Sequence, residues 1–226
     1  SGAIAQDTCR ACSVGQFSTS VGASSPEVCE PCPVGSVQPE EGRASCFPCL
    51  PGEFGNATGM RQCHKCDVGK ISETAAASNC SSCRPGYYQD TEGRASCLPC
   101  LPGEFGDTKG MASCHECDAG KVSEASKSWN CSECDAGKFS DTPGSAKCTS
   151  CGAGQYSNMK GEDCKNCPHG QYRPSGDGDP KRCLACKPGE TTKSSGAIAC
   201  DTCDLGMYGD GRVVGLCVPC QSGRYQ

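Results

Sequence analysis

The chain has 226 residues, of which 35% are hydrophobic and 5% aromatic, with 26 cysteines and a formal net charge of −5. This composition excludes a large hydrophobic core, and the cysteine content exceeds the level typical of disulfide scaffolds. The 21 basic residues are scattered singly, so the chain has no basic stripe and we expect no nucleic-acid partner.

Thirteen Cys-x-x-Cys pairs follow one another along the chain, and most of them are 17 residues apart. A fixed period of this kind predicts a tandem array, in which each repeat is stapled by disulfides and stacked on its neighbours. We expect one continuous array over residues 1–226. The repeats begin near Cys9, Cys29, Cys46, Cys63, Cys80, Cys97, Cys114, Cys131, Cys148, Cys164, Cys183, Cys200 and Cys217.

A glycine, here called the first glycine, follows the second cysteine of every pair by three residues. Such regularity predicts a tight turn in which this residue has positive φ. Two residues later, twelve of the thirteen repeats carry a sizeable apolar or aromatic side chain, and Thr191 is the exception. We expect these side chains to form the core, one per repeat, each packed against a neighbouring disulfide. They are Phe17, Val37, Phe54, Ile71, Tyr88, Phe105, Val122, Phe139, Tyr156, Tyr172, Tyr208 and Tyr225.

A second glycine often precedes the next pair by four residues, as at Gly42, Gly59 and Gly93. It indicates the return turn of a hairpin, and the loop between two pairs has room for two strands of three or four residues. The predicted fold class is therefore small and disulfide-rich. We expect an elongated, solenoid-like rod of thirteen repeats of about 17 residues, with short β-hairpins and turns and little or no helix.

An internal duplication overlies the short period. Residues 41–72 match residues 92–123 at 23 of 32 positions, an offset of 51 residues or three repeats. Side chains that both copies share, such as His64 and His115, can therefore be inherited with the copy rather than selected for chemistry. Residues 1–9 also recur as residues 195–203, with eight of nine positions identical, so we expect the chain to be a segment of a longer repetitive protein.

The cysteine pairs also approach the spacing of zinc sites, which bind the metal through four ligands. Each zinc ion would use two pairs, so thirteen pairs leave one over. We therefore predict disulfides, with no metal site and no cofactor. Because so many disulfides persist only in an oxidising compartment, we expect an extracellular or cell-surface location that is reached by the secretory pathway.

Two disulfide patterns fit the pairs. A ladder joins the second cysteine of one pair to the first of the next, whereas a crossed pattern groups the pairs in twos and joins the first cysteine to the third and the second to the fourth. We favour the ladder, because it can run along any number of pairs; it leaves Cys9 and Cys220 to bond outside the segment. It predicts the bonds Cys12 with Cys29, Cys32 with Cys46, Cys49 with Cys63, Cys66 with Cys80, Cys83 with Cys97, Cys100 with Cys114, Cys117 with Cys131, Cys134 with Cys148, Cys151 with Cys164, Cys167 with Cys183, Cys186 with Cys200, and Cys203 with Cys217.

The run Cys148-Thr-Ser-Cys-Gly-Ala-Gly-Gln-Tyr-Ser157 and its counterpart Cys131-Ser-Glu-Cys-Asp-Ala-Gly-Lys-Phe-Ser140 resemble the ephrin-receptor-like cysteine-rich repeat. That repeat is similar to the small modules of tumour-necrosis-factor-receptor ectodomains, in which one bridge closes the Cys-x-x-Gly-x-Tyr loop. The resemblance covers the chain from Cys9 to Tyr225 and implies an elongated surface or secreted protein. The loops here are more uniform than those of receptor modules, whose varied loops make a binding face.

No convergent set of acid, base and nucleophile residues is evident, and the thioredoxin-like frame that redox-active Cys-x-x-Cys pairs require is missing, so we expect no enzyme and no catalytic residue. His64 and His115 lie inside cysteine pairs and His169 follows a pair. We expect all three histidines to be simply exposed.

One irregular interval contains the segment Ser175-Gly-Asp-Gly-Asp-Pro180. Asp177 and Asp179 could lend oxygens to calcium, but calcium takes more ligands than these two residues supply. We therefore interpret the segment as a turn-rich insertion, which serves as a bend in the rod or as a contact between rods.

Three Asn-x-Ser/Thr sequons, at Asn56, Asn79 and Asn130, are acceptors for N-linked sugar in a secreted chain. A cysteine occupies the middle position at Asn79 and Asn130, which should make sugar transfer less efficient there than at Asn56. The serines and threonines of the loops can also carry O-linked sugar.

Uniform repeats and matching ends favour a structural component of an extracellular filament, matrix or cell-surface appendage, which assembles with copies of itself. The alternative is the ectodomain stalk of a cell-surface receptor or adhesion protein. No apolar stretch approaches the roughly 18 residues of a membrane span, so we expect none in this segment.

Overall fold

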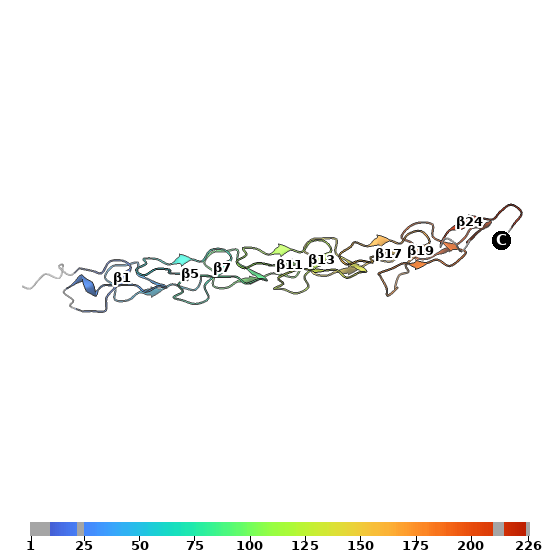
Figure 1. The fold of residues 1–226 in the computed structure, drawn as a ribbon. Helices are drawn as coiled ribbons and strands as arrows, with labels where there is room; N and C mark the ends of the chain where they lie inside the picture. The colour runs from blue at the N-terminus through green and yellow to red at the C-terminus, as the bar shows by residue number, and fades with distance from the viewer. Residues whose placement is uncertain (1–9, 22–24, 210–214, 225–226) are drawn as a thin grey trace, which may run out of the picture. The chain divides into compact units, whose positions relative to one another are not determined.

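The computed structural model describes residues 10–21, 25–209 and 215–224 of the chain. Its regular structure consists of very short β-strands (Figure 1), and these residues contain no α-helix. The chain divides into two compact bodies. The N-terminal body comprises Ser1–Cys100, Gly106–His115 and Lys127–Trp129, and the C-terminal body comprises Leu101–Phe105, Glu116–Ser126 and Asn130–Gln226.

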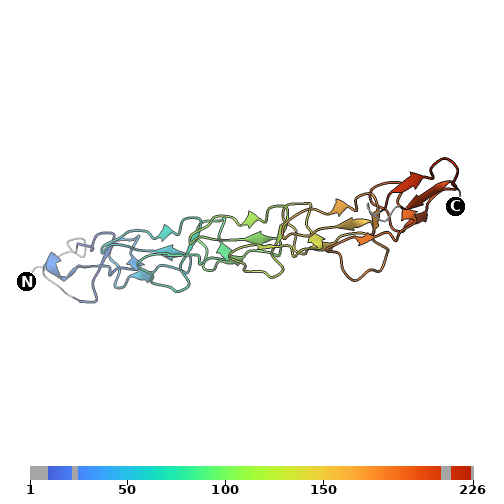
Figure 2. The same cartoon turned by 45° about the vertical axis from the view of Figure 1, so that its right-hand side comes forward.

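Consecutive strands pair as two-stranded sheets, β1 with β2 and so on to β23 with β24, and within each body they follow one another in sequence order (Figure 2). A single 3-10 turn, η2, spans Pro26–Val28 in the part of the chain that is described. The structure thus confirms the predicted disulfide-rich fold of short hairpins. The strands are β1 Gln16–Phe17, β2 Glu30–Pro31, β3 Ser36–Val37, β4 Phe47–Pro48, β5 Glu53–Phe54, β6 His64–Lys65, β7 Lys70–Ile71, β8 Ser81–Ser82, β9 Tyr87–Tyr88, β10 Leu98–Pro99, β11 Glu104–Phe105, β12 His115–Glu116, β13 Lys121–Val122, β14 Ser132–Glu133, β15 Lys138–Phe139, β16 Thr149–Ser150, β17 Gln155–Tyr156, β18 Lys165–Asn166, β19 Gln171–Tyr172, β20 Leu184–Ala185, β21 Glu190–Thr191, β22 Asp201–Thr202, β23 Met207–Gly209 and β24 Cys217–Pro219.

A β-turn precedes each hairpin and explains the first glycine. In the first repeat the amide of Gln16 donates to the carbonyl oxygen of Ser13 at 3.0 Å, and Gly15, the third residue of this turn, has a φ of 80°. These features fit a type II turn, whose third position needs positive φ. The first glycine has a φ between 73° and 90° in all thirteen repeats, which confirms the predicted turn.

The two strands of a hairpin come from fixed positions of the repeat. The first strand follows the first glycine, and the second strand is formed by the two residues between the cysteines of the next pair, so that Val37 lies opposite Phe47. The next amide along, that of Gln38, donates to the carbonyl oxygen of Met60 in the following repeat at 3.1 Å. Because this amide bonds outside its own hairpin, most strands have two residues and are shorter than the three or four predicted, whereas β23 and β24 have three.

Backbone hydrogen bonds join each repeat to the next within a body. The amide of the first glycine Gly52 donates to the carbonyl oxygen of Ser72 at 2.8 Å. The amide of Gly93, in a return turn, donates to the carbonyl oxygen of Cys66 at 2.8 Å. Equivalent bonds recur in the C-terminal body. These contacts between repeats are made by the backbone and need no particular side chain.

In most repeats a return turn two repeats further on covers the first glycine, whereas Gly189, Gly206 and Gly223 have no atom within 4 Å of an added Cβ. A Cβ atom added to Gly69 would lie 2.0 Å from the carbonyl oxygen of Gly110, a distance that no side chain can tolerate. The return turns also have positive φ, and two of them carry a residue other than glycine, namely Ala76 with a φ of 59° and Lys127 with a φ of 68°. Each of these two residues covers a first glycine with its carbonyl oxygen in the same way.

Cysteine side chains occupy the interior. Among the described residues, twelve disulfides join the second cysteine of one pair to the first of the next, from Cys12–Cys29 to Cys203–Cys217. The second cysteines from Cys12 to Cys186 are at most 8% exposed. Cys220 is free within this part of the chain, and Cys9 lies outside the described residues. Bonds of Cys9 and Cys220 to partners outside the segment stay a prediction.

The apolar position two residues after the first glycine belongs only partly to the core. Val37, Ile71 and Val122 are buried, whereas aromatic residues at this position, such as Phe54 and Tyr88, are half-buried. The prediction of one core residue per repeat is therefore right for these aliphatic side chains and wrong for the aromatic ones that are described; Tyr225 lies outside the described residues. An aromatic ring is too large to be enclosed between backbones that approach so closely, and part of it stays at the surface.

A polar or small residue lies at the next position and is buried in every repeat from Gln38 to Thr192. The side-chain nitrogen of Gln89 donates to the carbonyl oxygen of Ser96 at 2.7 Å, and its oxygen accepts from the amide of Thr91 at 3.1 Å. Since buried polar groups are stable only when they are hydrogen-bonded, these side chains hold the return turn in place. This position therefore contributes to the interior in every one of these repeats.

Peptide mapping of the unreduced protein tests the disulfide connectivity. Digestion without reduction should release Cys66 bonded to Cys80 and Cys83 bonded to Cys97, because in the structure each of these bonds closes the loop of one repeat. A crossed pattern would instead join two first cysteines, Cys46 to Cys63 or Cys63 to Cys80 according to how the pairs are grouped. Recovery of either crossed peptide would overturn the ladder.

Substitution of a first glycine tests the close approach of the backbones. Gly69→Ala should increase hydrogen–deuterium exchange at the amides of Cys83 and Gly110 far more than tenfold, because it adds a clash with a carbonyl oxygen to a left-handed penalty of about 1–2 kcal/mol. Gly176→Ala is the control, since Gly176 has a φ of 88° but no atom within 4 Å of an added Cβ. It should raise exchange in its own loop by roughly tenfold. Equal effects of the two substitutions would contradict the proposed role of the covering turn.

Candidate functional site

The three predicted glycosylation sequons lie at the surface. Asn56, Asn79 and Asn130 are all exposed. Asn79 and Asn130 directly precede disulfide-bonded cysteines, whereas Asn56 follows strand β5 by two residues. The backbone beside Asn79 and Asn130 is therefore tied to another part of the repeat. The lower efficiency of sugar transfer at these two sites stays a prediction.

The three histidines are exposed and lie on different elements. His64 lies in β6, with its ring centroid 5.6 Å from that of Phe54, and His115 lies in β12. The Nδ1 atom of His169 lies 3.4 Å from the carbonyl oxygen of Thr192. Over residues 10–21, 25–209 and 215–224, no three His, Cys, Asp or Glu side chains are grouped so that they could hold a metal ion.

The repeat that carries the insertion departs from its neighbours at Arg173. This residue takes the buried position that is Ser, Gln, Gly or Thr in the other repeats, and it is 5% exposed. Its Nη1 atom donates to the carbonyl oxygens of Cys151 at 3.1 Å and of Gln155 at 2.7 Å, and also to that of Gly152. A buried guanidinium is stable only with such partners. Arg173 thus ties the insertion to the preceding repeat.

The two aspartates of the insertion make bonds within their own loop. The Oδ1 atom of Asp177 accepts from the amide of Asp179 at 3.3 Å, and the Oδ2 atom of Asp177 lies 3.9 Å from the Nε atom of Arg173. Asp179 accepts from the amide of Lys181 at 3.1 Å and pairs with Arg182 at 3.1 Å. These bonds account for the carboxylates as turn-forming groups, which agrees with the interpretation of the segment as a turn-rich insertion.

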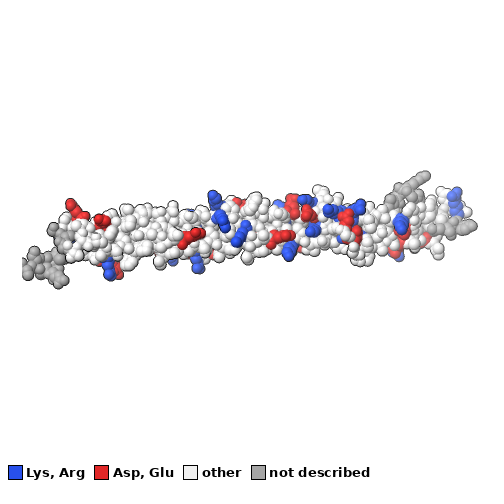
Figure 3. Space-filling view, turned by 90° about the horizontal axis from the view of Figure 1, so that it is seen from below, with Lys and Arg blue, Asp and Glu red and all other residues white. Residues whose placement is uncertain are grey.

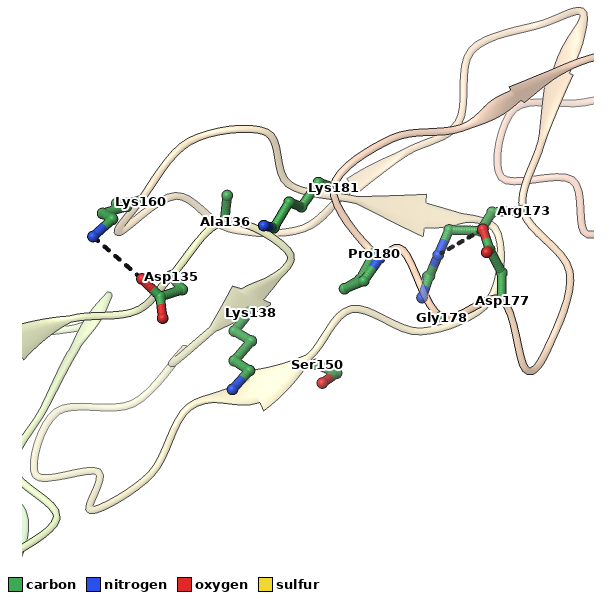
Figure 4. A pocket seen from close by; sticks show the side chains of 10 residues that line it. All are labelled: Asp135, Ala136, Lys138, Ser150, Lys160, Arg173, Asp177, Gly178, Pro180 and Lys181. Carbon is green, nitrogen blue, oxygen red and sulfur yellow. Dashed lines mark ion pairs between the residues drawn. The ribbon is translucent and has the colours of Figure 1, made fainter.

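A hollow of about 670 Å³ lies beside the insertion in the C-terminal body (Figure 4). Residues from three separate stretches of the chain line it, because the stacking of the repeats brings the insertion against two earlier hairpins. Pro180 lies over Gly137, with its Cγ atom 2.5 Å from the place of an added Cβ. The lining residues are Asp135, Ala136, Lys138, Ser150, Lys160, Arg173, Asp177, Gly178, Pro180 and Lys181.

Basic side chains outnumber acidic ones in this hollow. Lys160 pairs with Asp135 at 3.3 Å, and Arg173 pairs with Asp177. The other two cations that line the hollow belong to Lys138 and Lys181. On the face shown in Figure 3, by contrast, basic and acidic side chains are interspersed and neither sign forms an extended patch. The hollow is therefore a local concentration of positive charge.

A second basic group surrounds Tyr87 in the N-terminal body. The Nη2 atom of Arg84 donates to the hydroxyl of Tyr87 at 2.9 Å, and its guanidinium carbon lies 4.5 Å from the ring centroid. The Nζ atom of Lys127 lies 5.8 Å from the same centroid. The hydrogen bond from Arg84 lowers the pKa of Tyr87, and Lys127 acts in the same direction. Both cations lie against the same aromatic ring, which accounts for their positions.

Sequence reasoning missed the hollow. Only Arg173 could have been noticed in the sequence, because it replaces a small or uncharged residue at a regular position of the repeat that has the insertion. Lys138 and Lys181 could not, since they lie in different repeats and only the stacking of those repeats brings them to one surface. Among the residues described, no helix has the length and apolar character that a membrane crossing requires.

Two segments of the sequence match a known family of cysteine-rich repeats. Residues 69–117 and 154–203 match the family model described as tyrosine-protein kinase ephrin type A/B receptor-like. Each matched segment begins at a first glycine, ends at a second cysteine and spans three Cys-x-x-Cys pairs. Both segments are similar to ephrin-receptor-like repeats. The two segments together cover less than half of the chain, and a search of curated proteins finds no match to it.

The similarity to ephrin-receptor-like repeats bears on the kind of protein in which these two segments occur. Cysteine-rich repeats of this family are non-catalytic structural domains of receptor-type ectodomains. Together with the disulfides of the described residues, they indicate an extracellular or cell-surface location.

Removal of Arg173 tests its role in holding the insertion. Arg173→Ser should destabilise the loop at 174–182 by about 2–3 kcal/mol, because it removes charge-assisted hydrogen bonds and leaves Asp177 without its cation. Exchange at the amides of Asp179 and Lys181 should rise accordingly. The double variant Arg173→Ser with Asp177→Asn removes both charges and should be less destabilised than the single variant. A double variant that is destabilised as much or more would contradict the charge pairing.

Proposed function

We propose that the chain is part of the ectodomain of a cell-surface receptor or adhesion protein, in which the ephrin-receptor-like repeats act as a spacer. The observation that carries this proposal is the family match over two separate groups of repeats. The other prediction, a filament or matrix component that assembles with copies of itself, has no support from that match. The ectodomain alternative is therefore the better supported of the two.

Uniform joints between repeats support the role of a spacer. In the N-terminal body the amide of Gly69 donates to the carbonyl oxygen of Gln89 at 2.7 Å, and the amide of Gly110 donates to that of Cys83 at 2.8 Å. Stacking through nearest neighbours propagates in one dimension, so that the length of an array grows with the number of repeats. A spacer needs a reproducible length and no catalytic group.

We further propose that residues 1–226 form one continuous array of thirteen repeats and that Asn56, Asn79 and Asn130 carry N-linked sugar. Recurrence of the same backbone bonds in both bodies supports the first point, and the exposure of all three asparagines supports the second. Sugar at these positions would shield the surface of the array and oppose association between copies.

Surface labelling of intact source cells tests the function. A membrane-impermeant amine reagent should label peptides of this chain, and mild detergent should then release the protein as a single dispersed species. The same peptides should show higher sugar occupancy at Asn56 than at Asn79 or Asn130. Recovery of the chain in sedimenting, regular fibres would favour the filament, and labelling only after the cells are broken would overturn both functions.

A further inference from the structure

We propose that the hollow beside the insertion binds an acidic carbohydrate chain through its sulfate or carboxylate groups. The inference uses the extracellular or cell-surface location of the protein, but it does not depend on a receptor-type function. It rests on the charge, the geometry and the chemical character of the residues that line the hollow.

Two lysines give the hollow its uncompensated charge. The ammonium groups of Lys138 and Lys181 have no ion pair or hydrogen bond with any of the described side chains, whereas Lys160 and Arg173 each have a carboxylate partner. A concave surface with charge of one sign focuses the field and raises the local concentration of counter-ions. The hollow therefore attracts an anionic ligand.

Arg173 adds to this field from beneath the surface. Its Nε atom is buried and has no hydrogen-bond partner, because the nearest carboxylate oxygen, that of Asp177, lies 3.9 Å away. At this distance the pair interacts through charge alone and makes no hydrogen bond. The positive charge of the guanidinium is thus balanced less completely than in a hydrogen-bonded ion pair.

The two free ammonium groups belong to different elements. Lys138 lies in β15 and Lys181 lies in the insertion, and Figure 4 shows Lys181 above and Lys138 below the level of Pro180. Ser150, which lies opposite Lys138 in the paired strand β16, contributes a hydroxyl to the same surface. Separated cations suit a ligand that carries several anionic groups along its length better than they suit a single small ion.

The lining favours carbohydrate over nucleic acid. None of the ten lining residues is aromatic, and proteins that bind single-stranded nucleic acid stack its bases on aromatic side chains. A lysine ammonium is a compact point charge that pairs readily with sulfate or carboxylate. The hydroxyl of Ser150 and the exposed carboxylate of Asp135 can pair with sugar hydroxyls, which both donate and accept hydrogen bonds.

Titration of residues 1–226 with a heparin-derived octasaccharide tests the proposal. In low salt the octasaccharide should shift the amide NMR signals of Lys138, Ser150, Gly178 and Lys181 in a saturable way, and added salt should weaken the binding. The double variant Lys138→Gln with Lys181→Gln should bind about tenfold more weakly, since it removes two exposed ion pairs.

Matched controls distinguish the hollow from general charge. Lys147→Gln with Lys193→Gln makes the same change of charge at exposed lysines outside the hollow and should leave the affinity unchanged. The proposal is overturned by an equal loss in this control variant or by the absence of shifts at the hollow. It is also overturned if sodium sulfate or a single-stranded oligonucleotide produces the same shifts with equal affinity, because the site would then select charge and not carbohydrate.

Discussion

A glycine held beneath the backbone of another repeat is the constraint on which the rest of the structure depends. Gly69 uses its amide to reach Gln89 and its carbonyl oxygen to accept from Cys83. The place where its side chain would be is closed by Gly110. Three repeats therefore meet at one residue, and each of its backbone groups has a partner in the next repeat or in the one after it.

The disulfides stabilise the stack of repeats that the backbone hydrogen bonds form. With 35% hydrophobic residues, cysteine included, the chain has too little apolar surface to enclose a core of the usual kind. The buried second cysteines supply compact, apolar sulfur at the centre of each repeat. The disulfides also lower the conformational entropy of the unfolded chain, which favours the folded state of small domains with few core residues. The backbone bonds determine how the repeats are stacked, and the bridges make that stack stable.

The sequence predicted the features that repeat strictly and missed those that depend on packing. Thirteen glycines at one position predicted the positive-φ turns correctly, because only glycine adopts that geometry without cost. The aromatic position was assigned to the core because of its size, yet Phe54 and Tyr88 are half-buried while Gln89 is enclosed. Strands of two residues are too short for alternation to show which side faces inward. The hollow could not be predicted either, since Lys138 and Lys181 come together only through the stacking of their repeats.

The return turns differ from the first glycines in one respect that bears on how such arrays diversify. An added Cβ at Gly59 or Gly144 would lie at ordinary contact distance, 3.5 Å or more, from its neighbours. A side chain there meets only the left-handed conformational penalty of about 1–2 kcal/mol. Ala76 and Lys127 already occupy such positions, and Lys127 uses its position to reach the ring of Tyr87. Return turns with such open surroundings can therefore carry different side chains while the backbone hydrogen bonds between repeats stay the same.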